Sequence, residues 1–415
     1  MDRDRTRAAR RPAVVVSGVG AVSAAGLGSE ALWRAVTERR VLTGPVTRFD
    51  LSGYPARSAA EVPSETLAAL AALAALVPAA GSLAACYLVA ATLEGLRDAG
   101  LPARTRRHRL GLFVGTVMAT RPGLDRGIGP GRLVVPPDGG WARPDDLLAP
   151  VRAAVAVTGP TVLLAPGCAA GNSAIAAGCR AIAAGEVDVA VCAGVSELSL
   201  EILAMFTSLR ALEPETVRPF DVNRRGTIPG EGAAVLVLEP ADRVVARGRL
   251  PAAEVLACAA AADAHNPTQP HPEGHGLVTT LRGCLDRAGL TADDVDWICA
   301  HGTGTPASDG IEARAVARAL PGPRRPVVSS VKGQFGHAEG AAAALEAVIA
   351  VRALAEDLVP GNVTLVEPDP DCAGIDLVEP GGRRTPVRAV LSQAFGFGGG
   401  VSTVLFGRPS GATTG

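Results

Sequence analysis

The sequence predicts a layered α/β protein. Short runs rich in Val, Ile and Leu alternate with Ala-rich stretches of helical composition along most of the 415 residues. Several of these runs are apolar throughout, as expected for strands that helices cover on both faces. Regular alternation of such strands and helices is typical of layered α/β architectures. An apolar content of 48% is sufficient for a large buried core.

Eight apolar runs are the predicted strands. They are Ala13–Ser17, Leu110–Val114, Thr161–Ala165, Val187–Ala193, Ala233–Leu238, Trp297–Ala300, Val327–Ser330 and Val401–Phe406. The stretches Ala184–Glu197 and Ala292–Thr305 resemble each other, which suggests two related halves. We place these halves at residues 12–245 and 250–410, joined by an Arg- and Pro-rich segment.

Composition excludes several classes of protein. The net charge is −1 and aromatic residues make up 3%, so neither a polyanion-binding surface nor a base-stacking platform for nucleic acid is expected. The eight cysteines are widely spread and form no C-x-x-C pair, which argues against a zinc ribbon or a compact disulfide framework. We therefore expect a cytoplasmic protein with reduced, mostly buried thiols and no bound metal.

Two stretches imitate targeting signals. Arg10 and Arg11 precede a short apolar run, but this run reads better as a first strand followed by a turn. The segment Leu67–Leu93 is long enough to span a bilayer. Because it is mostly Ala and is interrupted at Pro78 and Gly81, we interpret it as two helices packed within a globular protein.

Cys168 is a candidate nucleophile. It follows a predicted strand and precedes a predicted helix that runs from about Gly171 to Gly185. The N-terminus of a helix carries partial positive charge, which favours a thiolate. Small neighbouring residues would let a substrate carbonyl approach the sulfur. The alternative for this residue is an unreactive buried thiol.

Two histidines occupy further turns of the same kind. His301 and His337 each lie in a Gly-flanked turn between a predicted strand and a predicted helix. Neutral imidazoles can polarise a carbonyl or carry protons, although a lone histidine is often structural. Two hydroxyl residues, Thr303 and Thr305, follow His301 in the same turn. Two carboxylates, Asp309 and Glu312, lie in the first turn of the next predicted helix, where they could also act as capping groups.

Lys332 is the single lysine of the chain, since the other 39 of the 40 basic residues are arginines. It lies five residues before His337, in a segment whose pattern predicts a strand, a turn and a helix. A compact ammonium group fits a tight, carboxylate-lined pocket better than a planar guanidinium does. We therefore predict that Lys332 orients the turn of His337 and sets its local charge.

Taken together and in their order along the chain, the motifs of this sequence resemble those of β-ketoacyl-acyl carrier protein synthases, the condensing enzymes of the thiolase fold. The resemblance covers nearly the whole chain. Its motifs are "VVVSGVGAVSAAG", "RFDLSGYPARSAAEV", the Cys168 turn, "RPFDVNRRGTIPGEGAAVLVLE", "DAHNPTQPHPEG", "HGTGTPASDGIE", "SSVKGQFGHAEGAA" and "FGFGG". The resemblance implies a duplicated five-layer α-β-α-β-α fold, with the nucleophile in the first half and both catalytic histidines in the second.

The resemblance also implies a role for each candidate residue. Cys168 would accept an acyl chain from the phosphopantetheine arm of an acyl carrier protein. His301 and His337 would promote decarboxylation of a malonyl unit, whose carbanion would attack the acyl thioester. Backbone N–H groups of Cys168 and Phe397 would form the oxyanion hole, and Phe397 would gate the site. The other expected roles are pantetheine binding by Thr303 and Thr305, an acyl pocket at Met118 and Phe206, a structural carboxylate at Asp309, and carboxylates near Lys332 at Glu312 and Glu346.

Three departures from the family pattern indicate a specialised member. Gly167 replaces the usual Ala before the nucleophile, Val401 stands where the family commonly has Asn, and residues 66–93 lack the usual polar spacing. We expect a type II polyketide synthase component, of the polyene type, that binds no cofactor tightly. It would form a dimer with itself or with a chain-length-factor-like homologue. The alternatives are a non-elongating partner subunit and an acyltransferase that does not decarboxylate malonyl groups.

Overall fold

The structure is a computed structural model that describes residues 12–48, 50–75, 82–118, 128–129, 132–133, 143–322 and 324–409. All eight predicted strands are present, most of them slightly shifted or extended. The first set of five paired strands comprises β1 (Val14–Ser23), β5 (Leu110–Gly115), β8 (Thr161–Leu164), β9 (Val189–Ser196) and β10 (Gly232–Pro240). The second comprises β11 (Ala253–Ala262), β12 (Trp297–Cys299), β13 (Val327–Ser329), β17 (Ala389–Phe395) and β18 (Gly400–Gly407).

The two sets repeat one topology. The first is ordered β8-β5-β9-β10-β1, and the second is ordered β13-β12-β17-β18-β11. In each set the second strand, β5 or β12, is parallel to both neighbours, and the fourth strand, β10 or β18, is antiparallel to both of its neighbours. Two residue pairs between β1 and β11 join the sets into one sheet. The fold is therefore duplicated, as the family resemblance implies.

The topology corrects the sequence repeat from which two halves were first suspected. That repeat aligns β9 with β12, whereas the strand order makes β9 equivalent to β17 and β12 equivalent to β5. The similarity of Ala184–Glu197 to Ala292–Thr305 therefore pairs two strands that are not equivalent in the duplication. It does not mark the register of the duplication.

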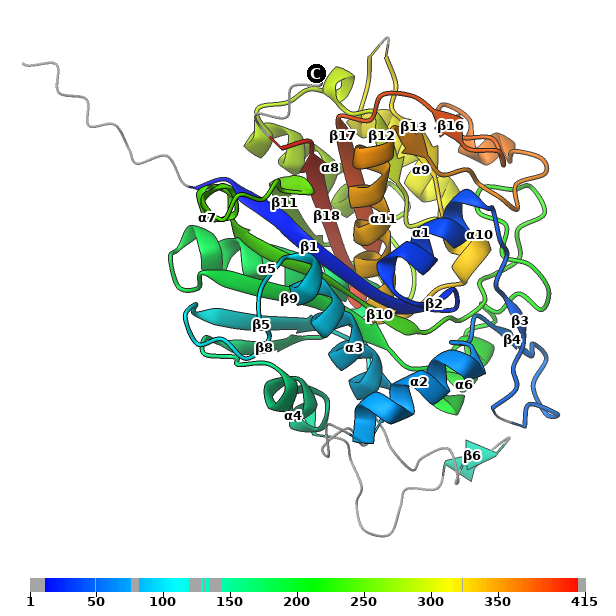
Figure 1. Cartoon of the computed structure of the whole chain (residues 1–415). Coiled ribbons are helices and arrows are strands. Elements are labelled where there is room, and N and C mark those ends of the chain that lie inside the picture. Colours follow the sequence, from blue (N-terminus) through cyan, green and yellow to red (C-terminus); the bar gives the residue numbers. More distant parts are fainter. Residues whose placement is uncertain are drawn as a thin grey trace, which may run out of the picture.

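Helices complete five layers (Figure 1). α3 (Leu83–Asp98) and α4 (Pro144–Ala154) cover the outer face of the first set, and α8 (His275–Ala288) and α9 (Asp309–Ala319) cover the outer face of the second. α5 (Ala170–Ala183) and α11 (Ala342–Glu356) lie between the sets, contact both, and contact each other. This is the predicted α-β-α-β-α arrangement.

The two central helices approach closely because their contact is made by small residues. A Cβ atom at Gly171 of α5 would lie 2.6 Å from the backbone nitrogen of Ala344 in α11. No real Cβ contact is that short, so this position requires glycine. The close approach brings together the N-terminal ends of α5 and α11, where Cys168 and His337 lie.

The remaining elements are short or peripheral. Among the helices they are α1 (Ser29–Thr37), α2 (Ser64–Ala75), α6 (Leu200–Ser208), α7 (Ala241–Ala246) and α10 (Lys332–Phe335). Short strands are β2 (Gly26–Leu27), β3 (Gly44–Pro45), β4 (Ser58–Ala59), β6 (Ile128–Gly129), β7 (Arg132–Leu133), β14 (Leu358–Val359), β15 (Asp376–Leu377) and β16 (Arg383–Arg384). Single 3-10 turns are η2 (Gly167–Ala169), η3 (Ala292–Asp294), η4 (Glu339–Ala341), η5 (Pro370–Cys372) and η6 (Phe397–Gly399).

Both stretches that imitate targeting signals fold into other elements. The apolar run after Arg11 is β1, every residue of which is buried. The Ala-rich segment forms α2 and α3, as predicted, while residues 76–81 between them lie outside the described residues. Within the described part of the chain, no helix combines the length and apolar character needed to cross a membrane.

Candidate active site

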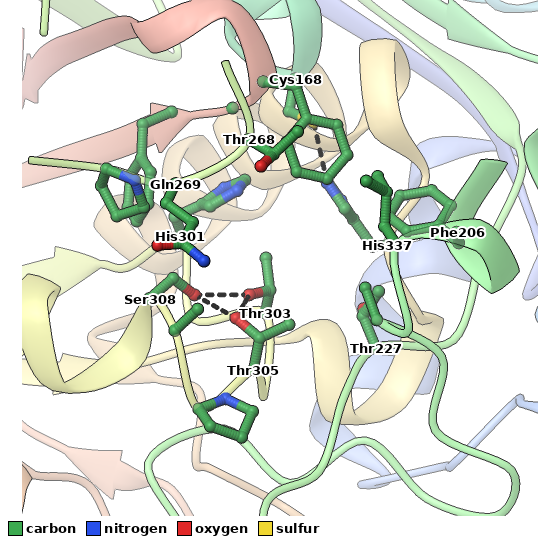
Figure 2. A pocket seen from close by; sticks show the side chains of 18 of the residues that line it. Cys168, Phe206, Thr227, Thr268, Gln269, His301, Thr303, Thr305, Ser308 and His337 are labelled. Atoms are coloured by element: carbon green, nitrogen blue, oxygen red, sulfur yellow. Dashed lines mark hydrogen bonds between the residues drawn. The ribbon is translucent and has the colours of Figure 1, made fainter. Parts of the chain in front are cut away.

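Three turns from different parts of the sheet bring Cys168, His301 and His337 together (Figure 2). Cys168 lies in η2 between β8 and α5, His301 directly follows β12, and His337 lies between α10 and η4. The Cys168 Sγ atom is 3.1 Å from Nε2 of His337. The two imidazole rings meet edge to face, with centroids 5.1 Å apart. One heteroatom from each of the three side chains lies within 4.8 Å of the others.

The three groups are buried, and burial keeps them neutral. Cys168, His301 and His337 are 7%, 3% and 2% exposed. Burial raises the pKa of the Cys168 thiol to about 12; the negative charge of Glu339 adds to the rise and the positive charge of Lys332 opposes it. This differs from the thiolate that the helix N-terminus alone led us to expect. Burial, and then Lys332, hold the pKa of both imidazoles well below the usual range.

A neutral thiol in contact with a neutral imidazole can become a nucleophile at the moment of reaction, when the imidazole takes its proton. His337 can take the thiol proton as the sulfur attacks, so no stable thiolate is required beforehand. The Cys168 thiol and the two imidazoles are also ligand types that could hold a zinc ion. The contact between the Cys168 thiol and His337 fits acyl transfer to Cys168 as well as it fits metal binding.

Backbone hydrogen bonds fix the position of His301. Glu312 of α9 accepts hydrogen bonds from the backbone N–H groups of His301 and Gly302, at 2.7 and 2.8 Å. The ring of Phe395 packs against the imidazole, with centroids 4.5 Å apart. Burial raises the pKa of Glu312 to about 8. Glu312 thus holds the turn of His301 through backbone groups.

Lys332 forms a buried ion pair with Glu346 of α11. The side chains are 1% and 2% exposed, and the Glu346 carboxyl has a pKa that burial raises to about 6. Lys332 is the first residue of α10, a single helical turn where we predicted only a loop. Of the two carboxylates expected near Lys332, Glu346 is therefore its ion-pair partner, while Glu312 bonds to the turn of His301.

Asp309 and three hydroxyl groups organise the turn after His301. Asp309 accepts hydrogen bonds from the backbone N–H groups of Phe220, at 2.9 Å, and Gly304, at 3.1 Å, which fits the structural role predicted for it. Thr303 and Thr305 share hydrogen bonds with Ser308, whose Oγ lies 2.8 and 2.5 Å from their Oγ1 atoms (Figure 2). The result is a polar wall beside the histidines.

A cavity of about 320 Å³ opens above this site. Its described lining includes Cys168, Phe206, His301, Thr303, Thr305, His337 and Phe397, which we expected at the site, and also residues to which we had assigned no individual role. These are Leu209, Arg210, Ala211, Arg225, Thr227, Thr268, Gln269, Pro270, Pro306, Ala307, Ser308, Phe395 and Gly396. Met118, predicted to line an acyl pocket, is partly buried and does not line this cavity.

Residues that we missed lie mainly in two loops. Thr268 and Gln269 belong to the motif "DAHNPTQPHPEG", which we noted as a whole without assigning a role to single residues. Ser308 follows Thr303 and Thr305 at a spacing that brings three hydroxyl groups together, and that spacing was the available signal. Arg225 belongs to the motif "RPFDVNRRGTIPGEGAAVLVLE", which we also noted only as a whole. No pattern within the sequence marked Arg210, because its position depends on how the loop after α6 folds over the cavity.

The glycine loop lies against the nucleophile. Gly396 is so close to Cys168 that an added Cβ would be 3.0 Å from Sγ. Gly167 has a φ of 66°, and a Cβ there would meet the carbonyl oxygen of Phe397 at 2.9 Å. The unusual glycine before the nucleophile therefore relieves both backbone strain and a collision with this loop. The ring of Phe397 packs 5.9 Å from that of Phe206, centroid to centroid.

Val401, which replaces the family Asn, is buried in a small apolar cluster with Leu277, Ala315 and Phe395. The loop before it is held by backbone hydrogen bonds. Gly398 donates to Pro267, and Asp263 donates to Gly399, at 2.7 and 2.8 Å. The polar group lost at this position is thus replaced by apolar packing.

Comparison with known proteins identifies the family. The family model described as "Beta-ketoacyl synthase, N-terminal domain" matches residues 11–243, and "Beta-ketoacyl synthase, C-terminal domain" matches residues 252–365. The 3-oxoacyl-[acyl-carrier-protein] synthase 2 of Coxiella burnetii is 31% identical over 95% of this chain and 98% of its own. The tetracenomycin polyketide synthase ketoacyl synthase alpha subunit of Streptomyces glaucescens is 32% identical over 95% of this chain and 97% of its own.

A solved structure agrees with these relatives. The ishigamide ketosynthase/chain length factor superposes with a TM-score of 0.83 at 29% identity, covering 96% of this chain and all of that one. The chain belongs to the β-ketoacyl synthase family. It is a condensing acyltransferase with the thiolase-like fold of that family.

Proposed function

We propose that the chain catalyses a decarboxylative condensation between an acyl group on Cys168 and a malonyl group on an acyl carrier protein. The observation that carries the proposal is the contact of the Cys168 thiol with Nε2 of His337, at 3.1 Å. A second neutral imidazole, that of His301, lies beside this pair at the base of the cavity. One nucleophile with two neutral imidazoles is what the two half-reactions need.

The first half-reaction loads the enzyme. The sulfur of Cys168 attacks the carbonyl of an acyl thioester carried on phosphopantetheine. The thiol proton passes to His337 and then to the departing pantetheine sulfur, so the acyl group is transferred without net proton loss. Backbone N–H groups of Cys168 and Phe397 would stabilise the tetrahedral oxyanion. The proximity of the Phe397 backbone to Gly167 supports this assignment.

The second half-reaction forms the carbon–carbon bond. A malonyl thioester enters the cavity, and the hydroxyl groups of Thr303 and Thr305 would bind its pantetheine arm. The imidazole N–H groups of His301 and His337 donate to the thioester carbonyl, which becomes an enolate as carbon dioxide leaves. The enolate attacks the acyl carbonyl on Cys168; the sulfur departs as thiolate, takes up a proton, and the β-ketoacyl-carrier protein is released.

Lys332 would act as a positioning residue. Its charge lies beside both histidines and lowers the pKa of each. An imidazolium could not take the proton of Cys168 during loading. The ion pair with Glu346 would hold this charge and the turn of His337 in place.

Partners and pathway follow from the relatives. We place the chain in polyketide biosynthesis, as the names of the Streptomyces relative and the ishigamide structure suggest, and in the cytoplasm, where its carrier-protein substrates would be made. Its partners would be an acyl carrier protein and a second ketosynthase-fold chain, either a copy of itself or a chain-length-factor-like homologue. We assign the nucleophile to a first half at residues 12–245 and the histidines to a second half at residues 250–410.

Intact-protein mass spectrometry tests the proposal. The chain is incubated with acyl-carrier protein and then with malonyl-carrier protein. We expect acylation of Cys168 alone, followed by its loss with release of carbon dioxide and appearance of β-ketoacyl-carrier protein. Condensation that persists in Cys168→Ala would refute the catalytic assignment. Acylation without release of carbon dioxide would instead identify an acyltransferase. A chain-length-factor-like role is disfavoured because Cys168, His301 and His337 lie together.

A further inference from the structure

One buried carboxyl beside the nucleophile has no role in the proposed reaction. Glu339 is the first residue of η4, two residues after His337, and it is 1% exposed. Its φ is 48°, in the left-handed region that non-glycine residues rarely adopt. Such a conformation persists only where the surroundings hold it, and it is often found at functional sites.

Only one oxygen of the Glu339 carboxyl is satisfied. Oε2 accepts a hydrogen bond from the hydroxyl of Ser196, at 3.3 Å. Within the described part of the chain, Oε1 is buried and has no hydrogen-bond partner. A buried polar atom without a partner destabilises the fold, so its retention calls for an explanation. Burial raises the pKa of this carboxyl to about 8, and at neutral pH it is therefore mostly protonated and able to donate.

The Glu339 carboxyl lies against the first set of strands, beside the turn of Cys168. Ser196 is the last residue of β9, and η4 contacts both β9 and η2, which holds Cys168. A Cβ at Gly340, the next residue, would lie 2.7 Å from the Cα of Thr116, directly after β5. When it is ionised, Glu339 raises the pKa of the Cys168 thiol more than any other charged neighbour does.

The cavity above Cys168, which receives the pantetheine arm under the proposed function, does not include Glu339 in its lining. Its polar wall is built from the turn after His301, in the second half of the chain. When Cys168 is acylated, the chain must extend away from the cavity that receives the next pantetheine arm. Glu339 and Met118 are both absent from the lining of that cavity, and η4, which carries Glu339, contacts the turn of Cys168.

Resting on the proposed function, we infer that Glu339 is a specificity-determining residue for the acyl group on Cys168. Its free oxygen, Oε1, forms a hydrogen bond with an oxygen on the acyl chain close to the thioester. The chain thereby favours acyl groups with a hydroxyl or keto oxygen near the carbonyl over plain alkyl groups of equal length. This is a binding role, and no bond to Glu339 forms or breaks.

Two variants separate donor chemistry from packing. Glu339→Gln keeps a donor and an acceptor in the same shape, whereas Glu339→Leu removes both at similar volume. Each variant and the wild type are offered hexanoyl-, 3-hydroxyhexanoyl- and 5-hydroxyhexanoyl-carrier protein, and the rate of Cys168 acylation is measured by intact-protein mass spectrometry. We expect the wild type to load 3-hydroxyhexanoyl about tenfold faster than hexanoyl, because its hydroxyl lies near the thioester. Glu339→Leu should lose this preference, and Glu339→Gln should keep most of it.

Equal loading of all three groups by the wild type would overturn the inference. So would a parallel slowing of all three in Glu339→Leu, since that would mean the carboxyl only supports the local fold or binds a water molecule. Thermal unfolding of both variants shows whether they are folded. The proposed function fails separately: it is refuted when no acyl group reaches Cys168 in the wild type, whereas the inference is refuted by loading without discrimination.

Discussion

The turns that hold Cys168 and His337 occupy equivalent places in the two halves of the fold. Cys168 lies between β8 and α5, and His337 lies between β13 and α11, and each strand is the first in the order of its set. Both turns pass through a 3-10 turn before a central helix, η2 in one case and η4 in the other. The chemistry they present is nevertheless different.

The first turn is built from small, uncharged residues, and the second contains charged ones. Around Cys168 lie Gly167, Ala169 and Ala170, which expose backbone groups and leave space. The second turn contains Lys332 and Glu339 and is longer by the single turn of α10. A duplicated scaffold thus supplies two adjacent positions. One carries Cys168, the proposed nucleophile, and the other carries Lys332 and His337, the proposed charge and base that act on it.

Removing the Cys168 thiol tests the role of the first turn most directly. Cys168→Ala should lower condensation by at least about a thousandfold, because the acyl-enzyme intermediate cannot form. Intact-protein mass spectrometry should find no acyl adduct on the variant. Cys299→Ala is a suitable control, since this buried thiol lies in β12 and should leave acylation unchanged. An adduct that survives in Cys168→Ala would place the nucleophile elsewhere.

Replacing His337 and replacing His301 should slow different steps of the reaction. Nε2 of His337 lies 3.1 Å from the thiol sulfur, whereas a ring nitrogen of His301 lies within 4.8 Å of the sulfur and makes no hydrogen bond to it. His337→Ala should therefore slow both acylation of Cys168 and decarboxylation of malonyl-carrier protein by about a hundredfold or more. His301→Ala should slow decarboxylation to a similar extent and leave acylation within a few-fold of the wild type. Single-turnover acylation and carbon dioxide release, measured separately, test the difference; equal losses in both steps for both variants would contradict it.

Lys332 offers a test through pH. Its positive charge lowers the pKa of both imidazoles, so removing it in Lys332→Met should raise those pKa values. The imidazoles would then become protonated at a higher pH, and the acid limb of the pH–rate profile should move to higher pH. Lys332→Arg keeps the charge and should leave that limb in place, while lowering the rate about tenfold because the site is closely packed.

The unfolding free energy of the Lys332→Met and Lys332→Arg variants is the control for their rates. Lys332→Met leaves Glu346 buried without its partner, which should cost about 3 kcal/mol of unfolding free energy. Assays therefore belong well below the measured unfolding temperature. A wild-type rate in Lys332→Arg would mean that the single lysine reflects composition alone. An unchanged acid limb in Lys332→Met would show that the charge does not control the histidines.

Much of this arrangement could be predicted from the sequence because it depends on local pattern. The strand-turn-helix segments of Cys168, His301 and His337 each carry their own apolar run and their own glycines. What could not be predicted depends on packing between distant segments. Glu312 bonds to the turn of His301 and Glu346 pairs with Lys332, and only the tertiary fold decides between these partners. The raised pKa of Cys168 likewise follows from burial by elements far along the chain.

The smallest expected effect concerns the glycine before the nucleophile. Gly167 and Gly185 have nearly the same left-handed backbone, with φ of 66° and 70°. A Cβ at Gly185 meets nothing within 4 Å, whereas one at Gly167 meets the Phe397 carbonyl oxygen at 2.9 Å. Both Gly→Ala variants should lose about 1–2 kcal/mol of stability from backbone strain. Gly167→Ala should in addition lower the acylation rate about tenfold, because the Phe397 loop must move. Equal activity in the two variants would show that the contact with Phe397 does not position the oxyanion hole.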